Sequence, residues 1–147
     1  MMEYAQRIVV EAPFETALGD LHRALREEGL QTLARIDLRD HFWRSIGRDF
    51  RCCFLVDAWS PALAFEALQQ SLDTATVLPT TFAVYELAGG ETAIAARQPF
   101  VPVVDERAWR QRSAALAAIA DREGEHVARV LARVQHRFAD ESRSPAA

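Results

Sequence analysis

Two adjacent cysteines, Cys52 and Cys53, are the first residues of this chain that could do chemistry, and there are no other cysteines. They lie in the apolar run from Arg51 to Pro61, which we expect to form a strand, so that the two side chains point to opposite faces. Opposed thiols cannot hold one metal ion together, and a disulfide between neighbours needs a distorted peptide. Arg51 is the one local feature that favours a lowered thiol pKa. We therefore predict that both cysteines fill the core.

Polar residues follow at the end of the same run. Asp57 closes the apolar stretch, and a buried carboxylate there needs an arginine or a backbone N–H as its partner. Ser60 and Pro61 predict a helix start, and the N-terminus of that helix can bind an anion if it is left open. Trp59 could stack on a flat ligand or fill the pocket itself. We favour a structural role for Asp57 and packing for Trp59, with ligand binding as the alternative.

The histidines are scattered along the chain. His126 and His136 are ten positions apart, so on a helix they diverge by about 80° and do not form a metal-binding pair. His41 lies beside Phe42 and could line the mouth of a pocket. We predict no metal site and no cofactor.

Arginines recur every four residues near the C-terminus. Arg129, Arg133 and Arg137 share one side of a predicted helix, and Glu125 is placed to pair with Arg129. We interpret this stripe as a solvated helix face. The alternative is an interaction module that uses the arginine-rich helix on an acidic partner or another anion.

The composition removes several classes of mechanism. The 147-residue chain has no lysine and no asparagine, so all 17 of its basic residues are arginine. A Schiff-base lysine, a P-loop lysine and a Cys-His-Asn triad are therefore excluded. The net charge of −4 argues against a nucleic-acid partner, and no apolar run reaches the ~18 residues of a membrane helix. The first twenty residues carry no signal-peptide pattern, and we expect a cytoplasmic protein.

These residues must be positioned by alternating strands and helices. Apolar periodicity, caps and turn residues predict strands at 3–11, 30–36, 51–58, 77–87 and 92–96. They predict helices from Pro13 to Gly29, from Asp37 to Gly47, from Ser60 through Leu68, and from 105 to 138 with a break at 121–124. In the second strand we expect Thr32, Ala34 and Ile36 to share a face, and in the third helix we expect Phe65 to be buried with Leu63. We predict one α+β domain over residues 1–139, with a frayed tail at 140–147. Its single five-stranded, largely antiparallel sheet is covered mainly on one face by helices, in the order β-α-β-α-β-α-β-β-α.

A set of spaced motifs resembles the domain of unknown function 302 family over about residues 7–135. The matching pieces are Arg26-Glu-Glu-Gly29, Gly47-Arg-Asp-Phe50, Ala58-Trp-Ser-Pro61, Val77-Leu-Pro79 and Tyr85-Glu86 before a Gly-Gly turn. The resemblance implies a small α/β protein with a fold similar to the TATA-binding-protein class, pairing as a homodimer, with no established activity.

The chain departs from its relatives at two positions. They often carry cysteine in an Ala-Cys-Asn-Pro segment and in a Leu-Leu-Pro-Cys segment, where this chain has Trp59 and Thr80. We expect a non-enzymatic homodimer that binds a small-molecule ligand or acts as a scaffold, with Asp57, Trp59, Ser60 and Thr80 as the candidate ligand-binding residues. The alternative is an enzyme of hydrolytic or redox type that uses Asp57, Ser60, Thr80 or the cysteines. We expect no nucleic-acid partner and no membrane contact.

Overall fold

The computed structural model describes residues 5–97, 107 and 113–143, with the side chains of 140–143 left out. Its strands are β1 (Ala5–Val10), β2 (Gln31–Asp37), β3 (Cys53–Trp59), β4 (Thr80–Glu86) and β5 (Thr92–Arg97). Its α-helices are α1 (Phe14–Glu27), α2 (Leu38–Ile46), α3 (Pro61–Gln70) and α5 (Ala114–Arg143), and two short 3-10 helices are η1 (Leu72–Val77) and η2 (Ala88–Gly90). The predicted order of elements is confirmed.

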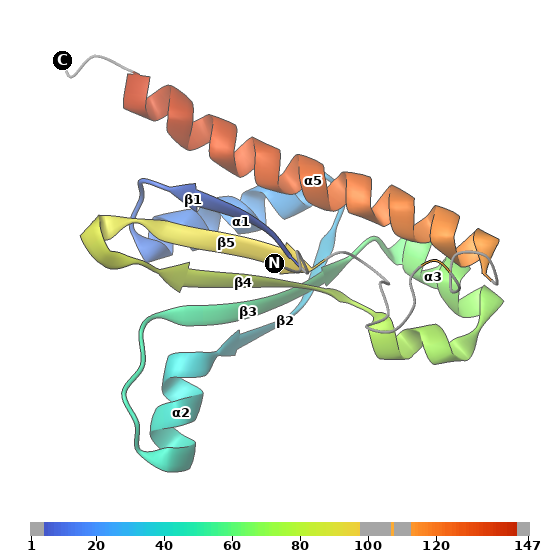
Figure 1. Cartoon of the computed structure of the whole chain (residues 1–147), viewed down its shortest axis with the longest axis horizontal. Coiled ribbons are helices and arrows are strands. Elements are labelled where there is room, and N and C mark those ends of the chain that lie inside the picture. Colours follow the sequence, from blue (N-terminus) through green and yellow to red (C-terminus); the bar gives the residue numbers. More distant parts are fainter. Residues whose placement is uncertain (1–4, 98–106, 108–112, 144–147) are drawn as a thin grey trace.

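The strands form one sheet in the order β1-β5-β4-β3-β2, and every neighbouring pair is antiparallel. Helices α1 and α5 cover one face of the sheet, and α3 lies beyond its end, beside the first half of α5 (Figure 1). None of the described helices covers the other face of the sheet, which we call the open face. Helix α2 extends away from the body next to β2 and β3 (Figure 1).

The main core lies between the sheet and the helices α1 and α5. Alternate residues of the central strands point into it, among them Val56, Phe82, Val84 and Ile94, which are fully buried. Helix α5 contributes one apolar stripe at helical spacing, made of Val127, Val130, Leu131 and Val134. A second, smaller cluster joins α3 to the first half of α5 through Leu63, Ala67, Ile119 and Ala120.

The predicted helix boundaries depend on local hydrogen bonds that are present in the structure. Asp37 caps α2, because its Oδ1 accepts from the N–H of Asp40 at 3.1 Å, and Gly47 ends that helix with φ of 62°. Gly29 follows α1 with φ of 76°, the left-handed conformation that glycine adopts without steric cost. Pro13 stands one residue before α1, as its N-cap.

Two predictions about faces are wrong. In β2, Thr32 pairs with Ala58 but Ala34 pairs with Asp57, so a bulge between them puts Thr32 and Ala34 on different faces. In α3, Phe65 is 66% exposed, whereas Leu63, Ala64 and Ala67 are buried. At 100° per residue, Phe65 lies about 200° around the helix from Leu63, and α5 contacts only one side of α3.

Helix α5 runs without a break through residues 121–124, so the predicted kink is also wrong. A glycine inside a helix costs about 1 kcal/mol relative to alanine. Buried side chains on both sides of Gly124, from Ile119 to Val134, pack against α3, α1 and the sheet and outweigh that cost. The helix extends to Arg143, so residues 140–143 are helical. Helix α5 begins at Ala114 and residue 113 is not helical, so the predicted continuous helix from 105 is wrong at this point. The predicted start at 105, and residues 144–147 of the predicted tail at 140–147, lie outside the described residues.

The fourth strand begins at Thr80 rather than at Val77. Val77 ends the 3-10 helix η1, and Pro79 has no N–H to donate to a neighbouring strand. The hairpin turn at Ala88–Gly90 is confirmed, with positive φ at Gly89 and Gly90 and a bond from the Leu87 N–H to the Glu91 carbonyl at 2.8 Å.

Candidate functional site

Two of the four predicted ligand-binding residues lie on opposite faces of the sheet. Asp57 alternates with Val56 and Ala58, so it points to the open face, where its Oδ1 accepts a hydrogen bond from the Thr81 hydroxyl at 2.7 Å. Thr80 pairs with Ala58, points to the helix-covered face and is buried. A threonine hydroxyl, rather than an arginine or a cap N–H, is therefore the partner of the Asp57 carboxylate.

Trp59 and Ser60 stand at the end of β3, where the chain enters α3. Trp59 is half-buried and lies in the strand position that points to the open face. Ser60 caps α3, because its Oγ accepts from the Leu63 N–H at 3.4 Å, which confirms the predicted helix start. The N–H of Ser60 donates to Glu123 Oε1 at 3.3 Å, so a carboxylate of α5 reaches the start of α3.

Glu123 is the residue of this region that the sequence reasoning missed. It is only 3% exposed, and its Oε2 is buried without a hydrogen-bond partner in the described part of the chain. Burial raises the pKa of this carboxyl from its ordinary 4.5 to about 7, although the Ser60 N–H acts in the opposite direction. A carboxyl with this pKa can hold or release a proton near neutral pH.

A signal for Glu123 was present in the sequence. Residues 119, 123 and 127 are spaced by four, so on one continuous helix Glu123 lies in the same apolar stripe as Ile119 and Val127. A charged residue in such a stripe needs a special explanation. The expected break at 121–124 hid it, because a broken helix would place the two halves of the stripe independently.

The cysteines behave as predicted from the strand pattern. Both thiols are free, Cys53 is buried, and Cys52 is half-buried and packs against the main core. Burial raises the pKa of the Cys53 thiol, and this effect outweighs the opposing charge of Arg51. The Cys52 Sγ accepts a weak hydrogen bond from Arg39 Nη1 at 3.6 Å. These observations favour packing over reactivity at Cys53.

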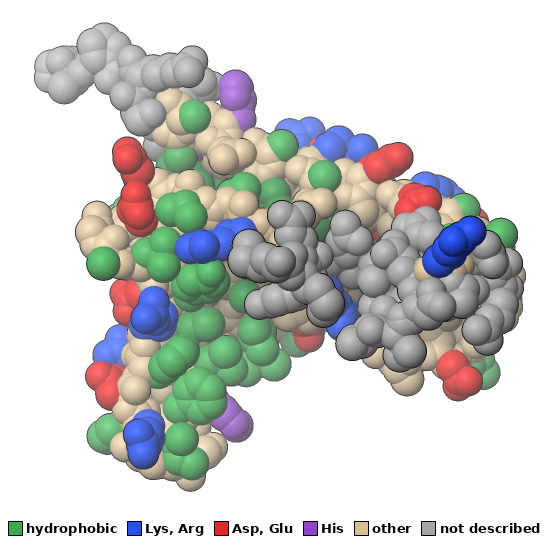
Figure 2. All heavy atoms as spheres, in the orientation of Figure 1, with side chains coloured by type: hydrophobic (Ala, Val, Ile, Leu, Met, Phe, Trp, Pro, Cys, Tyr) green, Lys and Arg blue, Asp and Glu red, His purple; other side chains and the backbone are tan. Residues whose placement is uncertain are grey.

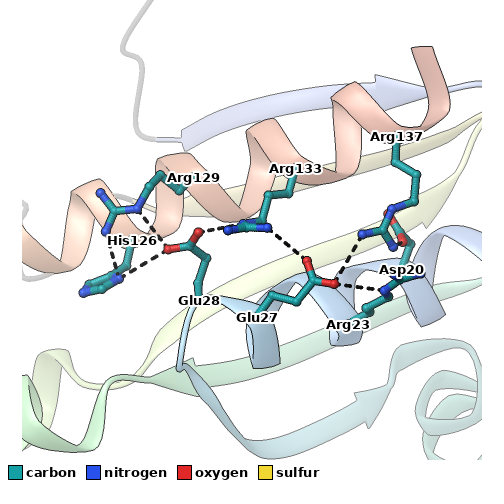
Figure 3. Close-up of polar contacts among 8 residues, drawn as sticks. All are labelled: Asp20, Arg23, Glu27, Glu28, His126, Arg129, Arg133 and Arg137. Atoms are coloured by element: carbon teal, nitrogen blue, oxygen red, sulfur yellow. Dashed lines mark hydrogen bonds and ion pairs between the residues drawn. The ribbon is translucent and has the colours of Figure 1, made fainter. Parts of the chain in front are cut away.

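The predicted arginine stripe contacts another helix of the same chain. Arg129, Arg133 and Arg137 face α1, where they meet Glu28, Glu27 and Asp20, and we call this set of six residues the arginine ladder (Figure 3). Arg133 Nε lies 2.6 Å from Glu28 Oε1, and Arg129 Nε lies 2.9 Å from Glu28 Oε2. The ladder therefore joins two helices that are about one hundred residues apart in the sequence.

The ladder changes the protonation of its acidic members. Hydrogen bonds from Arg129 and Arg133 lower the pKa of Glu28. Asp20 differs, because burial raises the pKa of its carboxyl more than the contact with Arg137 lowers it. The expected pair between Glu125 and Arg129 is not among the ion pairs of the described residues, and Arg129 instead contacts Glu28 and the His126 ring, the latter at 3.0 Å. The three arginines therefore form ion pairs with acidic residues at α1 and do not form a cationic surface that is free to bind a partner.

The histidines and acidic residues do not gather into a metal-binding group anywhere in the described ranges. His41 is exposed on α2 and contacts the Phe42 ring at 6.1 Å between centroids. Within the same described ranges, no helix combines the length and the apolar character that crossing a bilayer requires.

Residues 6–135 match the family described as Domain of unknown function DUF302. The chain belongs to this family. A crystal structure of the uncharacterized conserved protein DUF302 from Bacillus stearothermophilus shares the fold, with a TM-score of 0.76 and 21% sequence identity, over 90% of this chain and 99% of that one. The comparison with curated proteins finds no match.

From the resemblance to the DUF302 family, cysteine was expected at the two positions where this chain has Trp59 and Thr80. The structure places them at the same end of the paired strands β3 and β4, one residue apart in register, because Thr80 pairs with Ala58. Neither carries a thiol, so the chemistry of a cysteine pair is absent at these two positions. The ligand-binding role of Asp57, Trp59, Ser60 and Thr80 stays a prediction.

Proposed function

We propose that the chain is a homodimeric binding scaffold without catalysis of its own, in which helix α2 and the open face of the sheet form the contact between copies. The observation that carries this proposal is the exposure of α2. The helix has no buried residue, and Trp43 and Ile46 are 63% and 65% exposed. Phe50, in the segment that returns from α2 to β3, is 41% exposed. We call residues 38–50 the α2 arm.

The arm needs a partner for a physical reason. An isolated helix of 9 residues is not stable in water, because nucleation is unfavourable and little side-chain packing compensates for it. In the arm, the ring contact between Phe42 and Phe50, at 5.2 Å between centroids, supplies only a small local cluster. Contact with another surface would bury Trp43 and Ile46 and would stabilise the helix.

A second copy of this chain is the occupant that we propose. Figure 2 shows hydrophobic side chains gathered on the α2 arm and continuing onto the strands beside it. The two edge strands add further exposed apolar residues, Ile36 and Leu33 on β2 and Val9 on β1. An interface with two-fold symmetry presents the same patch from both copies, so the arm of each protomer can cover the open face of the other. Two ion pairs lie within the arm, Arg44 with Asp40 and Arg39 with Asp49. With Arg48, its three arginines and two aspartates sum to a net charge of +1, which is a small charge to oppose that contact.

An enzymatic role has less support. The candidates for a hydrolytic or redox reaction do not converge, since Asp57 and Thr80 point to opposite faces and burial raises the pKa of the Cys53 thiol. The C-terminal helix is a weak candidate for an acidic partner, because its three regularly spaced arginines already contact acidic residues of α1. Binding without catalysis fits these observations better.

We further propose a fold of the TATA-binding-protein class and a cytoplasmic location. An antiparallel sheet with its helices gathered on one face supports the first of these. Two free cysteines, one half-buried and one buried, suit a reducing compartment. DNA binding does not follow from the fold, and the net charge of −4 gives it no support.

The dimer is tested by sedimentation at micromolar protein concentration. We expect the wild type to sediment as a dimer and Trp43→Asp or Ile46→Asp to shift the equilibrium toward monomer. An interfacial tryptophan typically contributes 2 kcal/mol or more, so we expect dissociation constants weakened by at least about 30-fold. Each side chain is largely exposed in the protomer, so the fold should survive both changes.

Phe65→Asp is the matched control for both arm variants. Phe65 is 66% exposed, similar to Trp43, but lies on α3 at the other end of the molecule (Figure 1). It should leave the dimer intact. A monomeric wild type, or equal dissociation by Phe65→Asp and Trp43→Asp, would rule out the α2 arm as the interface.

A further inference from the structure

A groove with cationic walls lies between α1 and β2, on the side of α1 away from the arginine ladder. Its volume is about 730 Å³, within the range of small-molecule sites. Helix α1 lines it with Gly19, His22 and Arg26, and β2 lines it with Gln31, Thr32 and Arg35. We call it the basic groove.

The two arginines of the groove differ from those of the ladder. Neither Arg26 nor Arg35 forms an ion pair with a carboxylate in the described part of the chain, although Arg23, one turn earlier on α1, pairs with Glu27 at 2.9 Å. The guanidinium of Arg35 is held over the Phe54 ring at 5.3 Å, which fixes the side chain without neutralising its charge. The groove therefore keeps two positive charges on a chain whose net charge is −4.

The charges of Arg26 and Arg35 both act on His22. Burial lowers the pKa of its imidazole, and Arg35 and Arg26 lower it further. Its Nδ1 lies 3.4 Å from the Thr32 hydroxyl, and its Nε2 is buried without a hydrogen-bond partner among the described residues. Because that nitrogen is closed to solvent, the groups that the groove offers to an anion are the two guanidiniums without a carboxylate partner among the described residues.

Gly19 keeps the groove open. It lies inside α1, where glycine costs roughly 0.5–1 kcal/mol relative to alanine. A Cβ built at this position meets nothing within 4 Å, so packing does not require glycine here. A larger side chain would extend into open space on the wall of the groove, which offers a way to block it without changing its charge.

We propose that the basic groove binds the phosphate group of a small phosphomonoester. Two guanidiniums match the charge of a phosphate dianion and can donate to its oxygens in pairs, whereas a single carboxylate would leave one of them uncompensated. Thr32 and Gln31 add neutral donors, and the volume of the groove leaves room for the organic part of the ligand. The inference supplies a ligand for the binding role proposed above, but it does not depend on dimerisation.

His22 provides a direct readout of binding. Arg26 and Arg35 depress the pKa of His22, and a dianion between them would offset their charge, so the pKa of His22 should rise when phosphate binds. NMR titration of the imidazole signals, with inorganic phosphate and then with glycerol 3-phosphate, measures this shift. We expect a saturable rise of at least about half a pH unit, with His41 on the exposed α2 as the internal reference.

Charge variants identify the groove as the site. Arg26→Gln and Arg35→Gln should each weaken phosphate binding at least about tenfold. Arg23→Gln is the matched control, since it removes an arginine from the same helix that is already paired with Glu27, and it should bind like the wild type. Both groove arginines are exposed, so their loss should leave the fold intact, which an unchanged melting temperature would verify.

A steric variant and two ligand controls complete the test. Gly19→Leu should abolish binding while all the charges remain. Vesicles that contain phosphatidic acid test a lipid phosphomonoester against the soluble one. A larger shift of the His22 pKa with the vesicles than with glycerol 3-phosphate would overturn the proposal of a small soluble ligand. An equal His22 response to chloride at matched ionic strength, or equal loss of binding in Arg23→Gln, would show general screening and overturn the proposal. Binding by the monomeric Trp43→Asp variant would show that the groove and the dimer are independent.

Discussion

The two halves of α5 place similar carboxyl groups in opposite situations. Near the C-terminal half, the Glu28 side chain is 8% exposed and lies between Arg129 and Arg133, which lower its pKa. In the N-terminal half, Glu123 is 3% exposed and has one backbone N–H as its only partner among the described residues, and its pKa rises to about 7. Both groups are nearly inaccessible to water. At Glu28 the hydrogen bonds from two arginines outweigh the effect of burial, whereas at Glu123 burial outweighs the single bond from the Ser60 N–H.

The two halves of α5 also contact the rest of the protein in different ways. The arginine ladder joins α5 to α1 by contacts in which Arg133 and Arg129 are about half-exposed, at 47% and 50%, and Arg137 is 25% exposed. The contact with α3 is mainly apolar and includes an unsatisfied carboxylate oxygen of Glu123. The stability of the contact with α1 should therefore depend on salt and fall at acid pH. The contact with α3 should weaken as the pH rises.

The largest effect is expected from Glu123→Gln. The folded state holds the Glu123 proton more tightly than the unfolded chain does, so the stability that this carboxyl contributes falls as the pH rises from 4.5 to about 7 and stays constant above it. A shift of this size corresponds to roughly 3 kcal/mol. Chemical denaturation should show that Glu123→Gln raises the free energy of unfolding, relative to the wild type, by about 3 kcal/mol more at pH 8 than at pH 4.5.

Glutamine keeps the size of the side chain and can still accept from the Ser60 N–H, so the comparison isolates the charge. Parallel stability profiles of the wild type and Glu123→Gln between pH 4.5 and 8 would mean that Glu123 is not a buried titrating group. Such a result would remove the difference between the two halves of α5.

A smaller effect of opposite pH dependence is expected from Glu28→Gln. Because the folded-state pKa of Glu28 is lowered, its contribution is present above the ordinary value of 4.5 and is lost as the pH falls through the lowered pKa. We expect a destabilisation of about 1 kcal/mol at pH 7 that shrinks at pH 3, since both arginine partners can be solvated when the carboxylate is removed.

Glu125→Gln is the control for Glu28→Gln. Glu125 is exposed on α5, one turn from Arg129, and forms no ion pair in the described part of the chain. It should change the free energy of unfolding little at either pH. Equal effects of the two variants would indicate a general response to net charge rather than a specific ladder.

The smallest effect is expected from salt. At 1 M salt the screening length falls to about 3 Å, which weakens interactions of the half-exposed arginines more than those inside the protein. The destabilisation by Glu28→Gln should therefore decrease between 0.1 M and 1 M salt, while the effect of Glu123→Gln at pH 8 should hardly change. Denaturation curves of both variants at the two salt concentrations would measure this, and equal salt sensitivity would contradict the assignment of Glu123 to the interior.

The elements of this fold could be predicted because their signals are local. Asp37 and Gly47 delimit α2, Ser60 and Pro61 start α3, and Gly29 ends α1, each through the conformation or the hydrogen bonds of a few neighbouring residues. The strand predicted from residue 51 begins at Cys53, so only Cys53 lies in β3, and Cys52, just before it, packs against the main core. Predictions failed where packing acts over a distance, as at Phe65, which faces solvent, and at residues 121–124, where packing on both sides keeps α5 continuous.

The candidate sites were predicted less well than the fold. The sequence identified the spacing of Arg129, Arg133 and Arg137 but not their partners, because Glu28 and Asp20 are more than one hundred residues away. It placed Asp57 and Thr80 in one candidate set, although the register of β3 and β4 sends them to different faces. The basic groove could not be found at all, because Arg26 and Arg35 meet only when β2 packs beside α1.

The sequence by itself determined the type and order of the secondary structure, the family, and the absence of lysine and asparagine chemistry, because each depends on residue identity and short-range spacing. Only the tertiary structure decided which charges are neutralised, which are buried without a partner and which remain free. Those properties depend on distances between segments that are remote in the chain, and on the water that folding removes from around them.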